Sequence, residues 1–325
     1  MPTVAAHPVL CLIGPTASGK SGLAMAYALA RQASPSCVPI EIISLDSAQI
    51  YRGLNLGTAK PSLEERQAVV HHLIDLLEPE ELYSVARCHA DVTRAIDLIR
   101  ARGAQPLIVG GTMLYFKALA EGLDLLPQTP ESVRATLAAE AQAHGWPTLH
   151  AELMRVDAAT AQRLAVNDAQ RISRALEVYR HTQKPLSAWI RESQEAPENR
   201  LTALPMRTIA LLPERRQWLH ARIEIRFKEM VERGLLEEVR SLMLRPGLTP
   251  EHPSMRSVGY RQAWLHLSGA LSQEAFIQKG IEATRQLAKR QITWLRSFAS
   301  SGAVQVLAAE TASLDQLMTV WSSPD

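Results

Sequence analysis

Short apolar runs, each followed by glycine or polar residues, alternate with longer amphipathic segments in the first part of the chain. Val9–Ile13, Ile40–Leu45 and Leu107–Val109 have the length and composition of buried strands. Between them, the apolar spacing predicts one helix from about Gly22 to Arg31 and another from Ser84 to about Arg102. Strands alternating with helices are typical of an α/β fold with a parallel sheet.

Helical signals then take over, and a strand pattern returns only near residue 206. Asp157 and Asp168 are expected to cap helices in the middle stretch. Met206–Leu212 is a predicted strand, and long basic helices are expected after Pro213 and after Ser272. We therefore predict a core in two parts, residues 1–122 and 201–325, interrupted by a helical insertion domain at 123–200.

The segment after the first strand matches the phosphate-binding loop pattern G-x-x-x-x-G-K-[ST]. Its two glycines let several backbone N–H groups converge on one phosphate, and the following helix directs its positive dipole end there. The lysine adds a charge, and the final serine hydroxyl can bind Mg²⁺. The pattern predicts a P-loop NTPase-like core, with a parallel sheet flanked by helices, and these phosphate-binding residues: Gly14, Pro15, Thr16, Ala17, Ser18, Gly19, Lys20 and Ser21.

Two further strands are predicted to end beside this loop, because the carboxyl ends of parallel strands share one edge of the sheet. The second strand ends at Asp46, which can serve as a magnesium ligand, as a general base or as the cap of a turn. The third ends in Gly110-Gly111-Thr112, where many P-loop nucleotidases carry the aspartate of their magnesium site. The site therefore looks poorly equipped for nucleotide hydrolysis.

Composition changes this picture in one respect, the distribution of charge. Hydrophobic residues make up 46% and charged residues 21% of the 325, as in ordinary globular proteins, and the net charge is +2. Residues 200–300 hold 17 Lys and Arg against 9 Glu, a local charge of +8. This excess fits either a polyanionic partner or a solvated basic surface.

The apolar run before Gly14 is too short for a signal peptide or a membrane span. We therefore expect a cytoplasmic protein that does not associate with a membrane. No obligate protein partner is evident from the sequence.

Several stretches together resemble the bacterial tRNA dimethylallyltransferases, which prenylate an adenine beside the anticodon. They run in the order of that family over about nine-tenths of the chain. The P-loop is common to many families, whereas Asp-Ser-Ala-Gln-Ile-Tyr and Gly-Gly-Thr-Met-Leu-Tyr occur in few. The matching stretches are 14–21, 43–51, 57–61, 71–75, 110–115, 168–177 and 257–262.

The resemblance implies transfer of a dimethylallyl group from dimethylallyl diphosphate to the exocyclic amine of adenine 37, next to the anticodon of tRNA, with Mg²⁺ as cofactor. It implies that Asp46 is the general base and that Thr112 and Arg216 meet the diphosphate or the reacting adenine. It also implies a contact surface for the tRNA anticodon loop made of Asp46, Ser47, Ala48, Gln49, Thr112, Arg134, Gln170, Arg171, Ile172, Ser173, Arg174, Arg256, Ser257, Val258, Gly259, Tyr260 and Arg261. Charge spacing adds Arg285 and Lys289, which with Arg296 form a basic stripe on the helix after Ser272 that can follow a phosphate backbone.

Two other classes of function remain open from the residues alone. A nucleotide or small-molecule kinase would use the same P-loop on ATP. A non-catalytic RNA-binding protein would explain the basic segment but would leave the P-loop and Asp46 without a role.

Overall fold

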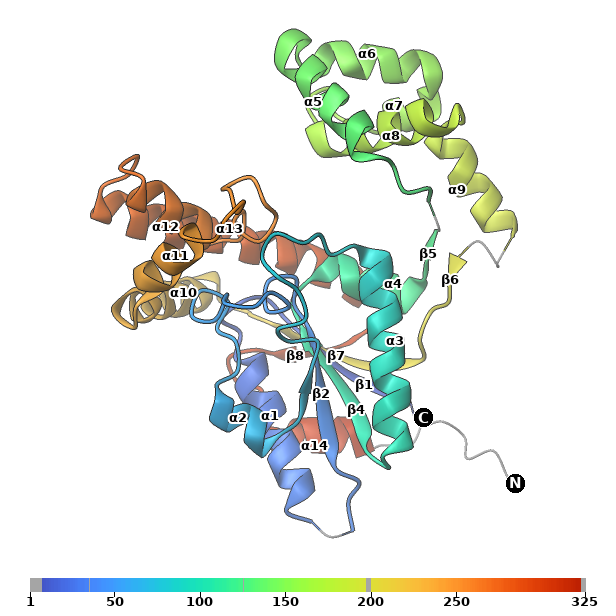
Figure 1. Cartoon of the computed structure of the whole chain (residues 1–325). Coiled ribbons are helices and arrows are strands. Elements are labelled where there is room, and N and C mark those ends of the chain that lie inside the picture. Colours follow the sequence, from blue (N-terminus) through green and yellow to red (C-terminus); the bar gives the residue numbers. More distant parts are fainter. Residues whose placement is uncertain (1–7, 35, 125, 197–199, 323–325) are drawn as a thin grey trace. The chain divides into compact units, whose positions relative to one another are not determined.

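The computed structural model describes residues 8–34, 36–124, 126–196 and 200–322, and the chain divides into two compact units (Figure 1). One unit, here called the core unit, comprises Met1–Ala120 and Leu204–Asp325. The other, the insertion unit, comprises Glu121–Ala203.

A six-stranded sheet forms the centre of the core unit, and every pair of neighbouring strands is parallel. The strand order is β3-β2-β4-β1-β7-β8. The predicted α/β fold with a parallel sheet is therefore confirmed. The strands are β1 (Val9–Ile13), β2 (Ile40–Leu45), β3 (His71–His72), β4 (Gln105–Gly110), β7 (Met206–Leu212) and β8 (Gln305–Ala308).

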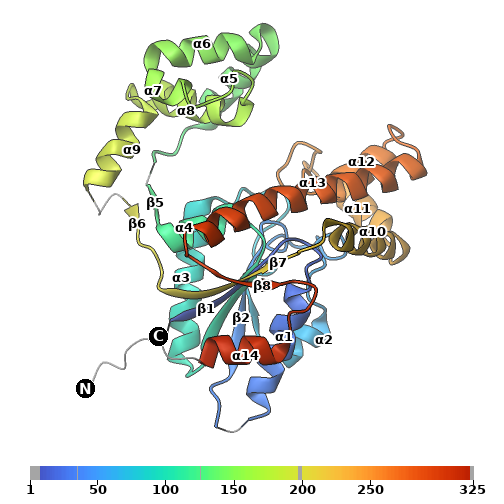
Figure 2. The ribbon, with the colours of Figure 1, turned by 180° about the vertical axis from the view of Figure 1, so that it is seen from behind.

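Helices cover both faces of this sheet, so side chains that alternate along each strand enter two different cores. In β1, Leu10 and Leu12 lie on the face that packs against α1 and α14, whereas Cys11 and Ile13 lie on the opposite face. Figure 2 shows α1 and α14 on one side of the strands. The first face is covered by α1 (Lys20–Gln32) and α14 (Leu314–Ser322). The opposite face is covered by α3 (Val85–Ala101), α4 (Met113–Glu121) and α13 (Gln273–Ser300).

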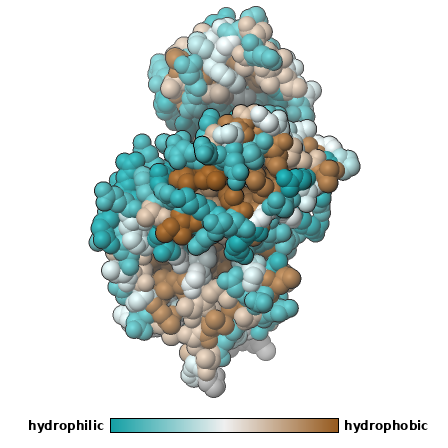
Figure 3. All heavy atoms as spheres, turned by 90° about the vertical axis from the view of Figure 1, so that its left-hand side faces the viewer, coloured by the Kyte–Doolittle hydropathy of each residue, from teal (hydrophilic) through white to brown (hydrophobic). Residues whose placement is uncertain are grey.

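Four further helices belong to the core unit: α2 (Leu63–Ala68), α10 (Arg216–Glu232), α11 (Leu235–Met243) and α12 (Tyr260–Leu267). Helices α10 and α13 approach closely at Gly280, where an added Cβ would lie 2.0 Å from the Phe227 ring. Figure 3, which faces the side formed by α10 to α12, shows apolar patches bordered by hydrophilic residues. Among the described residues, no helix is both long and apolar enough to cross a bilayer.

The insertion unit is helical apart from a short antiparallel pair of strands, β5 (Leu123–Asp124) and β6 (Arg200–Leu201). Its own core contains Leu137, Leu153 and Leu176. Asp157 and Asp168 cap helices, as predicted: their side chains accept hydrogen bonds from Thr160 N and Arg171 N. The helices are α5 (Glu131–His144), α6 (Trp146–Val156), α7 (Ala158–Ala161), α8 (Ala169–Thr182) and α9 (Leu186–Glu195).

Candidate active site

The carboxyl ends of three adjacent strands bring the P-loop, Asp46 and Thr112 to one edge of the sheet. Gly110 of β4 lies opposite both Ile13 of β1 and Leu45 of β2 in the strand register. Only glycine fits there, because a Cβ on Gly110 would lie 2.1 Å from the Leu45 carbonyl oxygen. The absence of an aspartate at this position thus reflects the close approach of β2 and β4.

The P-loop turns back on itself before α1 begins. Gly19 has a φ of 93°, in the region that glycine adopts without strain, and Ala17 has a φ of 63°. Lys20 Nζ donates to the Pro15 carbonyl oxygen at 3.3 Å, so the side chain folds over the loop. The pKa of Lys20 is lowered to about 8, mainly by burial and also by the nearby Arg226, against the opposing effect of the Asp46 carboxylate.

Asp46 is held by the turn that follows β2. Its Oδ1 accepts hydrogen bonds from Ala48 N at 2.8 Å and from Gln49 N at 3.3 Å. Ser47 N donates to Thr112 Oγ1 at 3.0 Å, which joins this turn to the loop after β4. Asp46 is therefore a turn cap, and its side chain also lines a cavity. The structural role uses only Oδ1, so it does not exclude the predicted role of Asp46 as a base or a magnesium ligand, which stays a prediction.

Gln49 is fixed by a third segment, the loop before α2. Its Oε1 accepts from Ser44 Oγ at 2.8 Å, and its Nε2 donates to the carbonyl oxygens of Thr58 and Ala59 at 3.2 and 3.3 Å. The α11 residue Glu238 in turn accepts from the backbone amides of Asn55 and Leu56. The loop is thus held by Gln49 at Thr58 and Ala59 and by Glu238 of α11 at Asn55 and Leu56.

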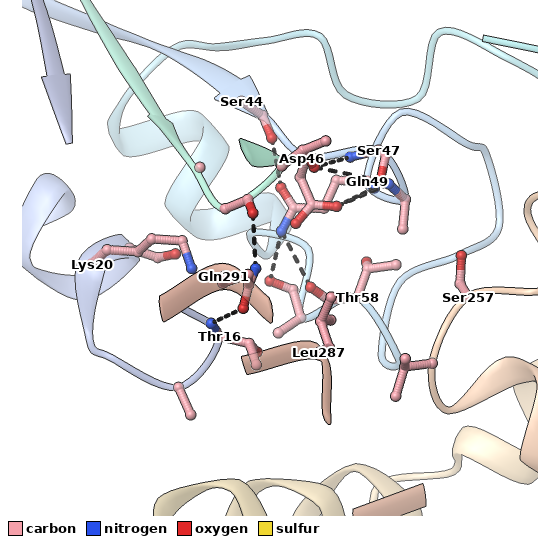
Figure 4. A pocket seen from close by; sticks show the side chains of 18 of the residues that line it. Thr16, Lys20, Ser44, Asp46, Ser47, Gln49, Thr58, Ser257, Leu287 and Gln291 are labelled. Atoms are coloured by element: carbon pink, nitrogen blue, oxygen red, sulfur yellow. Dashed lines mark hydrogen bonds between the residues drawn. The ribbon is translucent and has the colours of Figure 1, made fainter. Parts of the chain in front are cut away.

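These segments enclose a cavity of about 660 Å³ within the core unit (Figure 4). One part of its wall is polar and includes Lys20, Ser21, Asp46 and Thr112. Another part is apolar and comes from α1, α4, α10 and α13. The apolar lining residues are Met25, Met113, Leu114, Ile223, Phe227, Met230, Leu287 and Trp294.

Helix α10 supplies cations to this cavity, but Arg216 is not one of them. Arg216 is exposed at the start of the helix, donates to His220 Nε2 at 3.3 Å, and does not line the cavity. Arg226 does line it, and Arg222 Nε donates to the Ala17 carbonyl oxygen at 2.8 Å. Both also line a hollow of about 350 Å³ together with Lys20 and Ser21. Arg216 lines neither cavity, so its contact with the diphosphate or the reacting adenine stays a prediction of the resemblance.

The core-unit residues predicted to contact tRNA differ in exposure. Ser47, Arg256, Arg261 and Lys289 are exposed, and Ser257 and Val258 line the cavity. Arg285 is paired with Glu224 at 3.0 Å. Tyr260 is fully buried and donates its hydroxyl to Glu238, and Gly259 is buried before it. A tRNA contact through the Tyr260 side chain is therefore corrected to a packing role.

Within the insertion unit, the predicted residues fall into two groups. Gln170 and Arg171 are exposed, and Arg171 pairs with Asp168 at 2.6 Å. Arg134 and Arg174 lie 3.5 and 3.8 Å from the buried carboxylate of Glu177, which also accepts from Ser173 Oγ. Ile172 is fully buried in the unit's core, so its side chain is corrected to a packing role as well.

Sequence reasoning missed Gln291, Arg222 and Arg226. Arg222 and Arg226 lie on the same basic helix as Arg216. They are four residues apart, which places these two on one face of the helix. That spacing was the available signal. Gln291 carried no signal, because an isolated glutamine in a long helix predicts a solvent-facing residue, whereas here it is buried.

The sheet is parallel, the P-loop motif follows β1, and a carboxylate stands at the end of β2, which β4 separates from β1. These features define an α/β protein with a P-loop NTPase-like core and a helical insertion. The family model described as IPP transferase matches residues 49–298. The chain therefore belongs to the IPP transferase family, as the sequence motifs predicted.

Individual relatives agree with this assignment. The chain is 51% identical to a tRNA dimethylallyltransferase of Ralstonia pickettii over 303 residues, covering 93% of this chain and 91% of the relative. It is 54% identical to one of Burkholderia thailandensis over 291 residues, covering 89% and 87%.

Solved structures are similar over nearly the whole chain. The tRNA isopentenylpyrophosphate transferase of Bacillus halodurans has a TM-score of 0.65 and 31% identity, with 97% of this chain and 94% of that one covered. A eukaryotic dimethylallyltransferase described as acting on tRNA has a TM-score of 0.73 and 26% identity, with 94% and 74% covered.

Proposed function

We propose that this protein transfers a dimethylallyl group from dimethylallyl diphosphate to the exocyclic amine of adenine 37, next to the anticodon of tRNA. The observation that carries the proposal is a single cavity whose wall holds a phosphate loop, a carboxylate and an apolar surface. Those three features match a diphosphate, a proton to be removed and a short hydrocarbon chain. The relatives named as tRNA dimethylallyltransferases support the same reaction.

The leaving group would be held at the P-loop. Negative charge grows on the diphosphate as the bond between its oxygen and the allylic carbon breaks. Lys20 lies at the loop, and Arg222 and Arg226 line the same hollow, so their charges act where that charge develops. Positively charged groups already in place lower the barrier without reorganising during the reaction.

The residues present also fit Mg²⁺. Ser21, which carries a hydroxyl oxygen, lines the cavity. Mg²⁺ prefers oxygen ligands, and the protein often supplies one or two of them while phosphate and water supply the others. Within the described ranges, no group of three or more His, Cys, Asp or Glu side chains is placed to bind a metal. The Ser21 hydroxyl would hold the ion, and a bound Mg²⁺ would neutralise charge on the diphosphate oxygens.

Asp46 would take the proton that the adenine amine loses. The amine is a weak nucleophile because its lone pair is delocalised into the ring, so a base that accepts its proton as the carbon bond forms lowers the barrier. The turn cap fixes Asp46 through Oδ1, and the bond from Ser47 N to Thr112 Oγ1 ties this turn to the loop after β4. An adenine in a loop must also leave its stack to reach this cavity, at a cost of about a few kcal/mol.

The lowered pKa of Lys20 predicts that binding of a diphosphate depends on pH. A group whose pKa is lowered to about 8 is charged below that pH and loses its charge above it. We expect affinity for dimethylallyl thiolodiphosphate, an unreactive analogue, to fall as pH rises from 7.5 to 9.5. The terminal phosphate, with a second pKa of about 6, is already ionised there. Calorimetry across this range tests it, and Lys20→Ala should give weaker binding with little pH dependence. An equally steep decline in that variant would assign the effect to another group.

The exposed cations of α13 make a second prediction. Lys289 is exposed, whereas Arg285 is engaged by Glu224. Lys289→Ala should therefore flatten the log-log dependence of tRNA affinity on salt by about 0.7, the value for one phosphate contact on a single strand. Arg285→Ala should change the slope less, and Lys279→Ala, an exposed charge elsewhere on α13, should leave it unchanged. Equal slopes in all variants would show that Arg285 and Lys289 belong to a solvated surface that does not contact tRNA.

The competing function is phosphoryl transfer from ATP. Incubating the protein with tRNA and either labelled dimethylallyl diphosphate or γ-labelled ATP separates the two. We expect label in tRNA only from the prenyl donor. Label transferred from ATP, or tRNA binding without either transfer, would replace the proposed function with a kinase or with a binding protein.

A further inference from the structure

The side chain of Gln291 joins the P-loop to the loop after β4. It lies on α13 and is only 8% exposed. Its Oε1 accepts a hydrogen bond from Thr16 N at 2.9 Å, and its Nε2 donates to the Gly111 carbonyl oxygen at 2.8 Å. Figure 4 shows both bonds at the wall of the cavity. Both ends of the amide are thus used, one as acceptor and one as donor.

The P-loop and the loop after β4 pack tightly around the side chain of Gln291. A Cβ on Gly111 would lie 2.7 Å from Gln291 Nε2 and 3.1 Å from the Gly14 carbonyl oxygen. Gly14 N also donates to the Gly110 carbonyl oxygen at 3.3 Å. Because a buried amide must satisfy donor and acceptor at once, this junction accepts a side chain with both functions and rejects one with a single function.

One of these loops carries the residue expected to bind the diphosphate, and the other is bonded to the turn that holds the expected base. The P-loop holds Lys20, and the loop after β4 holds Thr112, which accepts from Ser47 N beside Asp46. Helix α13 also provides Leu287 and Trp294 to the apolar wall. Gln291 therefore links the place for the diphosphate, the turn that carries the carboxylate and the surface for the hydrocarbon chain.

The bond to Gln291 also changes what the P-loop offers to a phosphate. Thr16 N–H donates to Gln291, and Ser18 N–H donates to the Pro15 carbonyl oxygen at 3.3 Å. Both amides are engaged within the protein. We therefore expect a phosphate to meet the amides at the start of α1, next to Lys20, towards the helix end of the loop.

We infer that Gln291 is a positioning residue, which aligns the diphosphate held at the P-loop with Asp46 and the apolar wall. This inference rests on the proposed function for its chemistry. Its geometric content is that one buried amide sets the spacing between the two loops. Misplacement of reacting groups by about 1 Å can cost on the order of 10²-fold in rate.

Two substitutions test it. Gln291→Met keeps the approximate volume and removes both hydrogen bonds. Gln291→Glu keeps an acceptor for Thr16 N but faces the Gly111 carbonyl oxygen with a second oxygen. We expect single-turnover prenyl transfer to fall by roughly 10- to 100-fold in both at neutral pH, with tRNA affinity unchanged. Gln286→Met, an exposed glutamine on the same helix, is the matched control and should behave as wild type.

The pH profile separates positioning from simple packing. When the carboxyl introduced by Gln291→Glu is protonated, it can donate to the Gly111 carbonyl oxygen and restore both bonds, and burial raises the pKa of such a group. The defect of Gln291→Glu relative to wild type should therefore shrink as pH falls from 8 to about 5.5. That of Gln291→Met should stay constant.

Binding of inorganic diphosphate, measured by calorimetry, gives a readout that does not depend on transfer. We expect both Gln291 variants to bind it more weakly than wild type and Gln286→Met to bind it equally well. Wild-type rates and diphosphate affinity in a folded Gln291→Met would overturn the inference, as would identical, pH-independent defects in the two variants. If wild type binds diphosphate but transfers no prenyl group, the proposed function falls, while the diphosphate arm still decides whether Gln291 orders the loop.

Discussion

Asp46→Asn should reduce single-turnover prenyl transfer by about 10²-fold or more, because general-base catalysis contributes about 10² to 10⁴ in rate. Asparagine retains an Oδ1 that can accept from the amides of Ala48 and Gln49, so the turn after β2 should persist. The substitution therefore removes the proton acceptor and leaves the local structure. Affinity for tRNA should change little, and the thermal unfolding temperature should stay near that of wild type.

A magnesium titration separates the two catalytic interpretations of Asp46. If the carboxylate were mainly a ligand of Mg²⁺, raising the magnesium concentration should restore much of the rate, because occupancy would be limiting. We expect no such rescue at saturating tRNA and donor. Asp46→Ala, which removes the cap as well, should be slower still or less stable. A rate near that of wild type for Asp46→Asn would remove Asp46 from the mechanism.

Lys20→Ala should weaken binding of dimethylallyl thiolodiphosphate by roughly 10- to 100-fold, since a hydrogen bond to a charged group contributes about 1.5 to 3 kcal/mol. The ammonium group folds over the P-loop, against the Pro15 carbonyl oxygen, and lies in the cavity wall. Lys279→Ala, which removes an exposed charge on α13, is the control and should bind the analogue as wild type does.

Binding of tRNA should respond differently to the same variant. We expect Lys20→Ala to bind tRNA within about twofold of wild type, measured by filter binding at one fixed salt concentration. An equal loss of tRNA and analogue affinity would show that Lys20 acts on the fold or on a shared surface, and it would count against a dedicated diphosphate site.

The elements with strong local signals were predicted well from the sequence. The apolar runs of β1, β2 and β7 and the starts of α3 and α13, after Ser84 and Ser272, were predicted because hydrophobic period and helix-start signals act over a few residues. The edge strand β8 and the helix α14 were not predicted. β8 is short and half-exposed, so its sequence lacks the continuous apolar run that marks a buried strand.

The residues of the candidate site also divide into those with a local sequence signal and those without one. The P-loop and Asp46 follow directly after strands, and their chemistry can be read from a contiguous motif and from the rule that parallel strands end at one edge. Arg216 was chosen on a resemblance within a helix rich in arginine. Which arginine reaches the cavity depends on how α10 rotates as it packs on α13, and the contact of Phe227 with Gly280 fixes that rotation.

By itself, the sequence determined the α/β class, the phosphate loop, the carboxylate beside it and the family, because each depends on residues that are neighbours along the chain. Tertiary structure alone decided that Tyr260 is buried, that Arg222 and Arg226 approach the P-loop, and that Gln291 bonds Thr16 across 275 positions of the chain. The physical reason is that burial and hydrogen-bond partners between distant segments are set by packing of whole helices, which no local pattern encodes.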